Sequence, residues 1–127
     1  MKKLLLALLI VAFVIELVMT VGGFLMPEMT LGAFHVEVSE ISLFLGHVIA
    51  WFLLFVTLII GYAIYQVRKN DQSGWCLSYI LGAWWMGIGT TLFVCYGRTD
   101  NLFLDAAKGL LICIAAYKSC PNQPARA

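Results

Sequence analysis

The chain has 127 residues, of which 62% are hydrophobic and 12% charged, and its formal net charge is +1. A mean hydropathy of +0.93 is far too high for a soluble domain of this length, so we expect an integral membrane protein. The nearly neutral chain has no basic run of the kind that binds nucleic acid, and we expect no nucleic-acid partner. This length leaves room for one membrane domain and little else.

Four apolar segments qualify as membrane spans, because a bilayer core about 30 Å thick needs roughly 20 residues of helix. The first ends at Pro27, and the second is long enough to require tilt. The fourth is the weakest because Asp105 and Lys108 interrupt it, and an interfacial helix is the alternative there. We therefore expect an all-α, compact bundle of four transmembrane helices with a short polar tail at 119–127. The expected helices cover residues 4–26, 41–67, 75–96 and 102–117.

The first segment also resembles a secretory signal peptide. Lys2 and Lys3 precede an apolar stretch, and Thr20 with Gly22 forms a poor cleavage site. The apolar run is longer than the hydrophobic region of a usual signal, so we favour a retained helix.

Lysine and arginine fix the expected orientation, because they accumulate on the cytoplasmic side of membrane proteins. Basic residues precede the first segment, lie between the second and third, and follow the fourth, and these three places share one side. Both termini are then cytoplasmic, in the inner (plasma) membrane of a bacterium. The basic residues on that side are Lys2, Lys3, Arg68, Lys69, Lys118 and Arg126, whereas Arg98 with Asp100 falls in a loop on the other side. The aromatic belt expected on the cytoplasmic side is Tyr62, Tyr65, Trp75, Tyr79 and Tyr117.

Ionisable residues inside the apolar segments are the main candidates for a functional site, namely Glu16, His47, Asp105 and Lys108. A charge near the bilayer centre costs at least about 2.5 kcal/mol, so such residues usually face a bundle interior. At a rise of about 1.5 Å per residue, all four fall in the outer half of one bundle. The functional interpretation is a polar cavity for a proton, an anion or a polar head group. The structural interpretation, which we favour, is a buried ion pair of Lys108 with Asp105 or Glu16.

Small residues follow the ionisable ones at helical spacing, which predicts the faces on which helices meet. Small residues let helix backbones approach closely in a membrane and give polar groups partners. The same faces also offer surfaces for other membrane subunits or for self-association. The expected stripes are Ala12, Glu16, Thr20 and Gly23 in the first helix; His47, Ala50, Thr57 and Gly61 in the second; Ser78, Gly82 and Gly89 in the third; and Ala106, Gly109, Cys113 and Ala116 in the fourth.

Cofactor chemistry has little support in the sequence. The His47 imidazole is the one candidate ligand for haem iron or a chlorophyll-type pigment, but a hydrogen-bonded histidine is favoured over it. The four cysteines lack the spacing of a zinc or iron–sulfur site, so we expect packing thiols and no metal. Trp84 and Trp85 are interpreted as packing residues, with stacking on a ligand as the alternative.

Four short helices with a lone glutamate in the first resemble the small multidrug resistance transporters. Tryptophans in the third helix add to that resemblance. It implies a carboxylate that binds protons and cationic drugs in turn, a role that falls to Glu16. The long outer loop at 26–39, the strong charge bias and Lys108 inside a helix depart from that family's pattern.

Three functions remain open. We favour a small non-catalytic accessory or scaffolding subunit of a larger inner-membrane complex of respiratory or photosynthetic type, since the loops are short and Phe and Trp are abundant for packing. The first alternative is a small oligomeric proton-coupled transporter that uses Glu16. The second is a membrane redox or lipid-modifying enzyme using His47 and Glu16, although no nucleophile, metal or nucleotide motif points to a catalytic residue.

Overall fold

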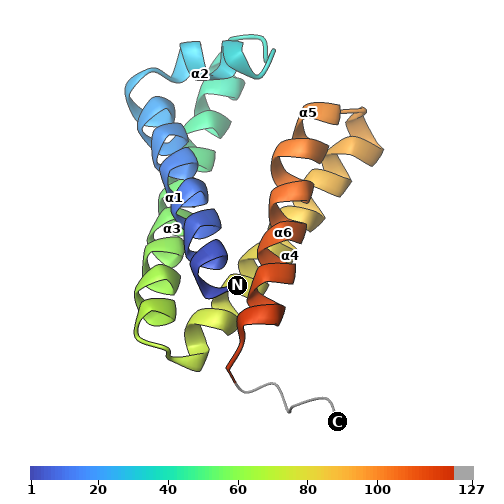
Figure 1. The fold of residues 1–127 in the computed structure, drawn as a ribbon. Coiled ribbons are helices and arrows are strands. Elements are labelled where there is room, and N and C mark those ends of the chain that lie inside the picture. Colours follow the sequence, from blue (N-terminus) through green and yellow to red (C-terminus); the bar gives the residue numbers. More distant parts are fainter. Residues whose placement is uncertain (122–127) are drawn as a thin grey trace. The chain divides into compact units, whose positions relative to one another are not determined.

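The computed structural model describes residues 1–121, and within them every regular element is helical (Figure 1). Three of the helices are long and apolar enough to cross a membrane, so the expected all-helical class is confirmed and the lengths fit a membrane protein. They are α1, α3 and α4. In chain order the elements are α1 (Lys2–Leu25), α2 (Pro27–Ala33), α3 (Glu40–Arg68), α4 (Gln72–Tyr96), α5 (Thr99–Asn101), the π-helix η1 (Leu102–Ala107) and α6 (Lys108–Ser119).

Local signals account for several helix ends. Asp71 caps the start of α4, where its carboxylate accepts a hydrogen bond from the Ser73 backbone N–H at 2.9 Å. Gly97 ends α4 in the left-handed conformation, with φ of 65°, which glycine adopts without steric cost. The expected bounds of the three long helices agree with these ends to within a few residues.

The helix α2 corrects the sequence analysis, which placed only a loop between Met26 and Ser39. Pro27 does end α1, as expected, but it also begins the next helix. Proline is well suited to the first helical turn because the missing N–H has no partner there in any case. In that short helix the Thr30 hydroxyl donates to the Met26 carbonyl at 2.9 Å.

The chain divides into two compact units, of which one holds Val11–Ile59 and the other holds Met1–Ile10 with the chain from Ile60 onward. In the first unit α1 and α3 meet closely at Gly23, where an added Cβ would lie 2.9 Å from the Ala50 Cβ. Beside this contact the Phe24 and Trp51 rings pack edge to face with centroids 5.3 Å apart. The small-residue faces expected for these two helices therefore do meet at this point.

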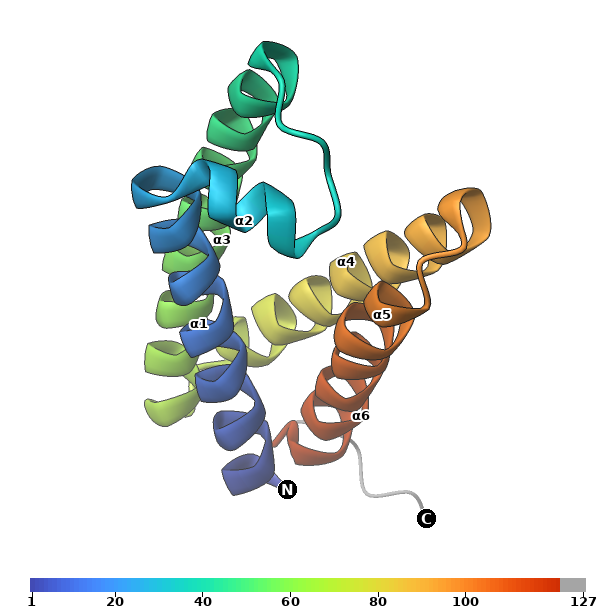
Figure 2. The same cartoon turned by 90° about the horizontal axis from the view of Figure 1, so that it is seen from above.

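In the second unit α4 packs along η1 and α6, and Figure 2 shows α4 and α6 side by side. A Cβ on Gly82 would lie 2.6 Å from the Cys113 Sγ and 2.8 Å from the Gly109 carbonyl oxygen. A Cβ on Gly109 would in turn meet the Gly82 carbonyl. The two backbones are therefore in contact, and the expected seam between these segments is confirmed.

The residues expected in the aromatic belt differ in exposure. Tyr62, Tyr65, Tyr79 and Tyr117 are all exposed, as residues that face the lipid interface should be. Trp75 is buried instead, and its indole N–H donates to the Ser119 hydroxyl at 3.0 Å. This bond joins the start of α4 to the end of α6, so Trp75 fixes helix packing and does not face lipid.

The fourth expected span, 102–117, falls on η1 and α6, which follow α5 without a break in helical structure. The longest regular α-helix in it, α6, has 12 residues and is too short to span a bilayer alone. A π-helix was not expected at any position. The four-span bundle with two cytoplasmic termini therefore remains a proposal.

Candidate functional site

A cluster of polar side chains occupies the start of the fourth helical segment. The Lys108 ammonium lies 3.4 Å from the Asp105 carboxylate, and these side chains are only 13% and 21% exposed. Asp105 also accepts a hydrogen bond from the Asn101 amide at 2.9 Å. The ammonium sits 4.3 Å from the centroid of the buried Trp85 ring, in cation–π geometry. Of the two partners expected for Lys108, Asp105 is therefore in contact with it.

The π-helix η1 and the glycines of α4 position this cluster. A Cβ on Gly89 would lie 2.6 Å from the Ala106 nitrogen and 2.8 Å from the Asn101 carbonyl oxygen. Only glycine permits the wider π turn to rest directly on α4. Single π turns are rare and occur frequently at functional sites, which marks Asp105 in η1 as the residue most worth testing.

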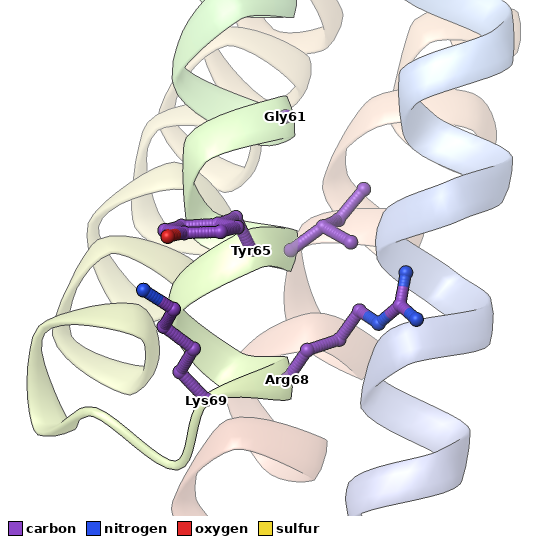
Figure 3. Close-up of a pocket in the computed structure, with 5 residues that line it drawn as sticks. Gly61, Tyr65, Arg68 and Lys69 are labelled. Carbon is purple, nitrogen blue, oxygen red and sulfur yellow. The ribbon is translucent and has the colours of Figure 1, made fainter.

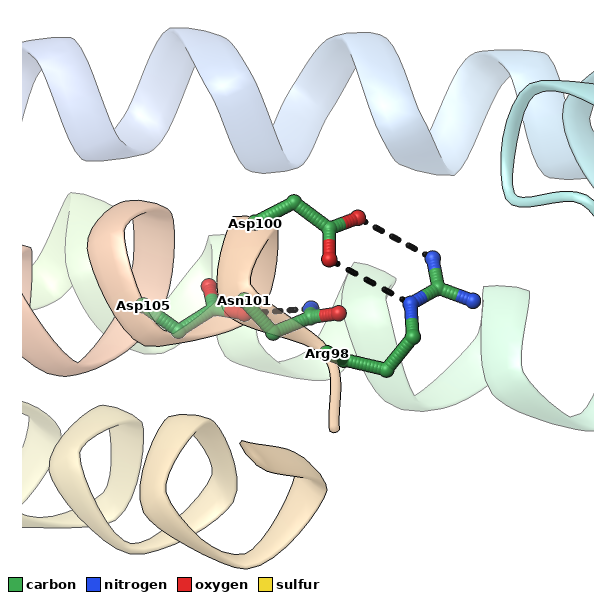
Figure 4. A network of polar contacts seen from close by, with 4 residues as sticks. All are labelled: Arg98, Asp100, Asn101 and Asp105. Atoms are coloured by element: carbon green, nitrogen blue, oxygen red, sulfur yellow. Dashed lines mark hydrogen bonds and ion pairs between the residues drawn. The ribbon is translucent and has the colours of Figure 1, made fainter. Parts of the chain in front are cut away.

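A second polar pair lies just before the cluster, in the connection after α4. The Arg98 guanidinium donates to both carboxylate oxygens of Asp100, at 3.3 and 3.0 Å (Figure 4). The hydrogen bonds from Arg98, and then its charge, hold the pKa of Asp100 below its ordinary value, and Asp100 raises the pKa of Arg98. The Arg98 and Asp100 side chains are 30% and 53% exposed, so solvent screens this pair and it adds little stability.

Glu16 lies on the buried face of α1, as expected, with only 6% of the residue exposed. One turn later the Thr20 hydroxyl donates to the Glu16 carbonyl at 2.7 Å, so the hydroxyl is satisfied within the helix. The buried face is continuous and consists of Leu5, Leu9, Ala12, Glu16, Thr20 and Gly23.

His47 differs from its expected place. Ala50 and Thr57 are buried on α3, whereas His47, one turn before Ala50, is exposed. Its Nδ1 donates to the Leu43 carbonyl at 2.8 Å, one turn earlier in the same helix. This bond uses one ring nitrogen only, so the choice between a hydrogen-bonded histidine and a haem or pigment ligand stays a prediction.

The four candidates are thus brought together only in part. Asp105 and Lys108 contact each other in one unit, whereas Glu16 and His47 belong to the other unit. The pairing of Lys108 with Glu16 therefore stays a prediction. Within residues 1–121 no three His, Cys, Asp or Glu side chains form a group that could hold a metal ion.

Sequence reasoning missed the contribution of Asn101, and for Trp85 it weighed packing and ligand stacking but not a contact with Lys108. The signal for Asn101 is its position four residues before Asp105, a spacing at which helical side chains meet. No comparable signal links Trp85 to Lys108, because that contact depends on how two helices pack.

These features define a helical protein with three candidate membrane spans and a polar cluster beside a glycine seam. Comparison of the chain with protein-family models, with curated proteins and with solved structures gives no match.

Proposed function

We propose that the protein is a four-span protein of the bacterial inner membrane, with both termini in the cytoplasm, that serves as a non-catalytic accessory subunit of a larger membrane complex. The observation that carries this proposal is an outward face of α4 that is suited to packing against another helix. Its residues share one side of the helix and are all exposed, namely Ala83, Gly87, Thr90, Thr91 and Val94. We call it the open face of α4.

The composition of the open face favours a partner helix over lipid. A Cβ added to Gly87 would meet nothing within 4 Å, so the chain's own packing does not require glycine there. The Thr90 and Thr91 hydroxyls make no hydrogen bond within the described part of the chain, whereas buried Thr20 and Thr57 each bond to a carbonyl one turn earlier. Small residues and hydroxyls are typical of contacts between membrane helices.

The exposed face of α1 provides a contrast within the same protein. It is built from large aliphatic side chains, as expected where a helix meets acyl chains. Such a surface needs no protein partner, and it supplies the natural control for the open face of α4. Its residues include Val11, Val14, Ile15, Val18, Val21 and Leu25.

The internal contacts of the polar cluster are also consistent with a structural role. Lys108 contacts Asp105 and the Trp85 ring, and Asp105 contacts Asn101. A charge held by partners in its own chain can fix helix register without taking part in transport or catalysis.

Purification in mild detergent after a Gly87→Leu substitution tests the proposal. We expect the wild-type chain to elute with a different membrane subunit at fixed stoichiometry, and Gly87→Leu to lose that subunit because leucine prevents close approach of the two helices. Val14→Leu, an apolar enlargement on the aliphatic face of α1, should retain it. Retention of the partner by Gly87→Leu would contradict the proposed interface.

The transporter alternative is favoured by one observation, the burial of the Glu16 carboxyl group in the middle of an apolar helix. It predicts a different outcome in the same purification. An oligomer made only of this chain, together with loss of proton-coupled uptake in Glu16→Gln, would support transport over an accessory role.

A further inference from the structure

An open pocket of about 490 Å³ lies at the C-terminal end of α3 (Figure 3). Its lining changes character along the helix axis, because Gly61 and Ile64 precede the cationic Arg68 and Lys69. Gly61 contributes only backbone, and Ile64 contributes the apolar side chain. Tyr65 lies between the apolar and cationic parts. The pocket therefore has one apolar part and one positively charged part.

In the part of the chain that the structure describes, no ion pair involves the basic side chains at this end of α3. Arg68 is exposed, and within residues 1–121 its guanidinium makes no hydrogen bond or ion pair. The Lys69 ammonium lies 4.3 Å from the centroid of the Tyr65 ring, a cation–π contact that leaves its charge intact. Arg68 and Lys69 extend in different directions from the helix end, so they bracket the pocket (Figure 3).

Lys2 adds a third positive charge. Its ammonium donates to the Arg68 backbone carbonyl at 3.5 Å and also to the Asn70 side-chain oxygen. The partial negative charge at a helix C-terminus can account for one basic residue in the last turn. It does not account for three basic side chains. Lys2 already bonds to the carbonyl at the helix end, and the Arg68 guanidinium makes no such bond within the described residues.

Asp71 is the acidic residue nearest along the chain. Its carboxylate accepts hydrogen bonds from the Ser73 hydroxyl at 2.7 Å and from the Ser73 backbone N–H at 2.9 Å. These bonds, together with the charge of Lys69, hold the pKa of Asp71 below its ordinary value. Asp71 therefore acts as a helix cap, and its single negative charge is smaller than the combined positive charge of Lys2, Arg68 and Lys69.

We propose that this pocket binds the headgroup phosphate of an anionic phospholipid, with the adjoining part of an acyl chain against Ile64 and the Gly61 backbone. The planar guanidinium of Arg68 matches a phosphate with two parallel donors, while Lys69 and Lys2 add charge. Anionic lipids are enriched in the cytoplasmic leaflet, and basic residues next to membrane helices attract them. The inference rests on the proposed topology, which places this end of α3 at the cytoplasmic surface.

Titration of the purified full chain in mild detergent with phosphatidylglycerol and with phosphatidylcholine of the same acyl chains tests the site. We expect tighter binding of phosphatidylglycerol, measured by native mass spectrometry, and about a fivefold loss in Arg68→Gln, since one basic residue at an anionic surface contributes about 1 kcal/mol. Lys118→Gln is the matched control, because it removes one exposed charge from the last turn of α6 and leaves the pocket intact. Ile64→Trp, which fills the apolar part, should also weaken binding.

Equal losses in Arg68→Gln and Lys118→Gln would overturn the proposal, because general attraction to an anionic surface would then explain the binding. Equal binding of the two lipids would also overturn it. Full competition by inorganic phosphate would indicate an anion site that does not recognise lipid. Binding in detergent does not depend on orientation, so a wrong topology is detected separately by labelling of the chain ends.

Discussion

Replacement of Gly82 by leucine should destabilise the protein by about 3 kcal/mol, at the upper end of the usual cost of overpacking. A single added Cβ would already lie 2.8 Å from the Gly109 carbonyl oxygen and 2.6 Å from the Cys113 Sγ. A change of rotamer cannot relieve a clash with backbone, so α4 and α6 must separate along their seam. Unfolding in mixed micelles, followed by far-ultraviolet circular dichroism, measures the loss.

Gly87→Leu is the matched control for this experiment, since it makes the same substitution in the same helix. Nothing lies within 4 Å of the position of its Cβ, and leucine has a higher helix propensity than glycine. Its free energy of unfolding should equal or slightly exceed that of the wild type. Equal stability of Gly82→Leu and Gly87→Leu would show that the seam is not a close backbone contact.

The second large effect is expected at Lys108. Lys108→Met should cost about 3 kcal/mol, because removing one member of a buried pair leaves the Asp105 carboxylate without its counter-charge. The pair retains some exposure, which places the cost at the lower end of the range for buried pairs. Lys108→Arg should cost much less, because it keeps the positive charge. The same unfolding assay measures both variants.

Double variants then identify the carboxylate that matters. If Asp105 is the main partner, adding Asp105→Asn to Lys108→Met should restore much of the lost stability, because removing both charges of a pair is far milder than removing one. If adding Glu16→Gln to Lys108→Met restored more stability, Glu16 would be the main partner. The sequence permits this, because it places Glu16 and Lys108 in the same half of the bundle. Additive losses in both double variants would mean that neither carboxylate couples to Lys108.

Much of the fold follows from local patterns in the sequence. Apolar length predicted α1, α3 and α4, and helical spacing predicted that Gly82 and Gly109 lie in a packed seam. Both signals are local to a helix face, so one sequence is enough to detect them. The short helix α2 was missed because proline was interpreted only as an end, whereas Pro27 also starts the next helix.

The candidate site was harder to predict because it depends on packing between helices. Asp105 and Lys108 are adjacent on one helix, so their contact follows from spacing. The π turn that carries Asp105 forms where η1 packs against Gly89. No residue in that segment is a sequence signal for a π-helix. The exposure of His47 was not foreseen, because a position in a small-residue stripe does not by itself distinguish a buried side chain from an exposed one.

Labelling of single cysteines in a cysteine-free variant tests the central claim, a four-span membrane protein with both ends in the cytoplasm. The proposal predicts that a membrane-impermeant thiol reagent added to intact spheroplasts labels Val38→Cys, and labels Gln72→Cys and Gln123→Cys only after the membrane is opened. The positive-inside bias is the physical basis of this expectation. Labelling of Gln123→Cys from outside, with Gln72→Cys still protected, would remove the fourth span and contradict the account.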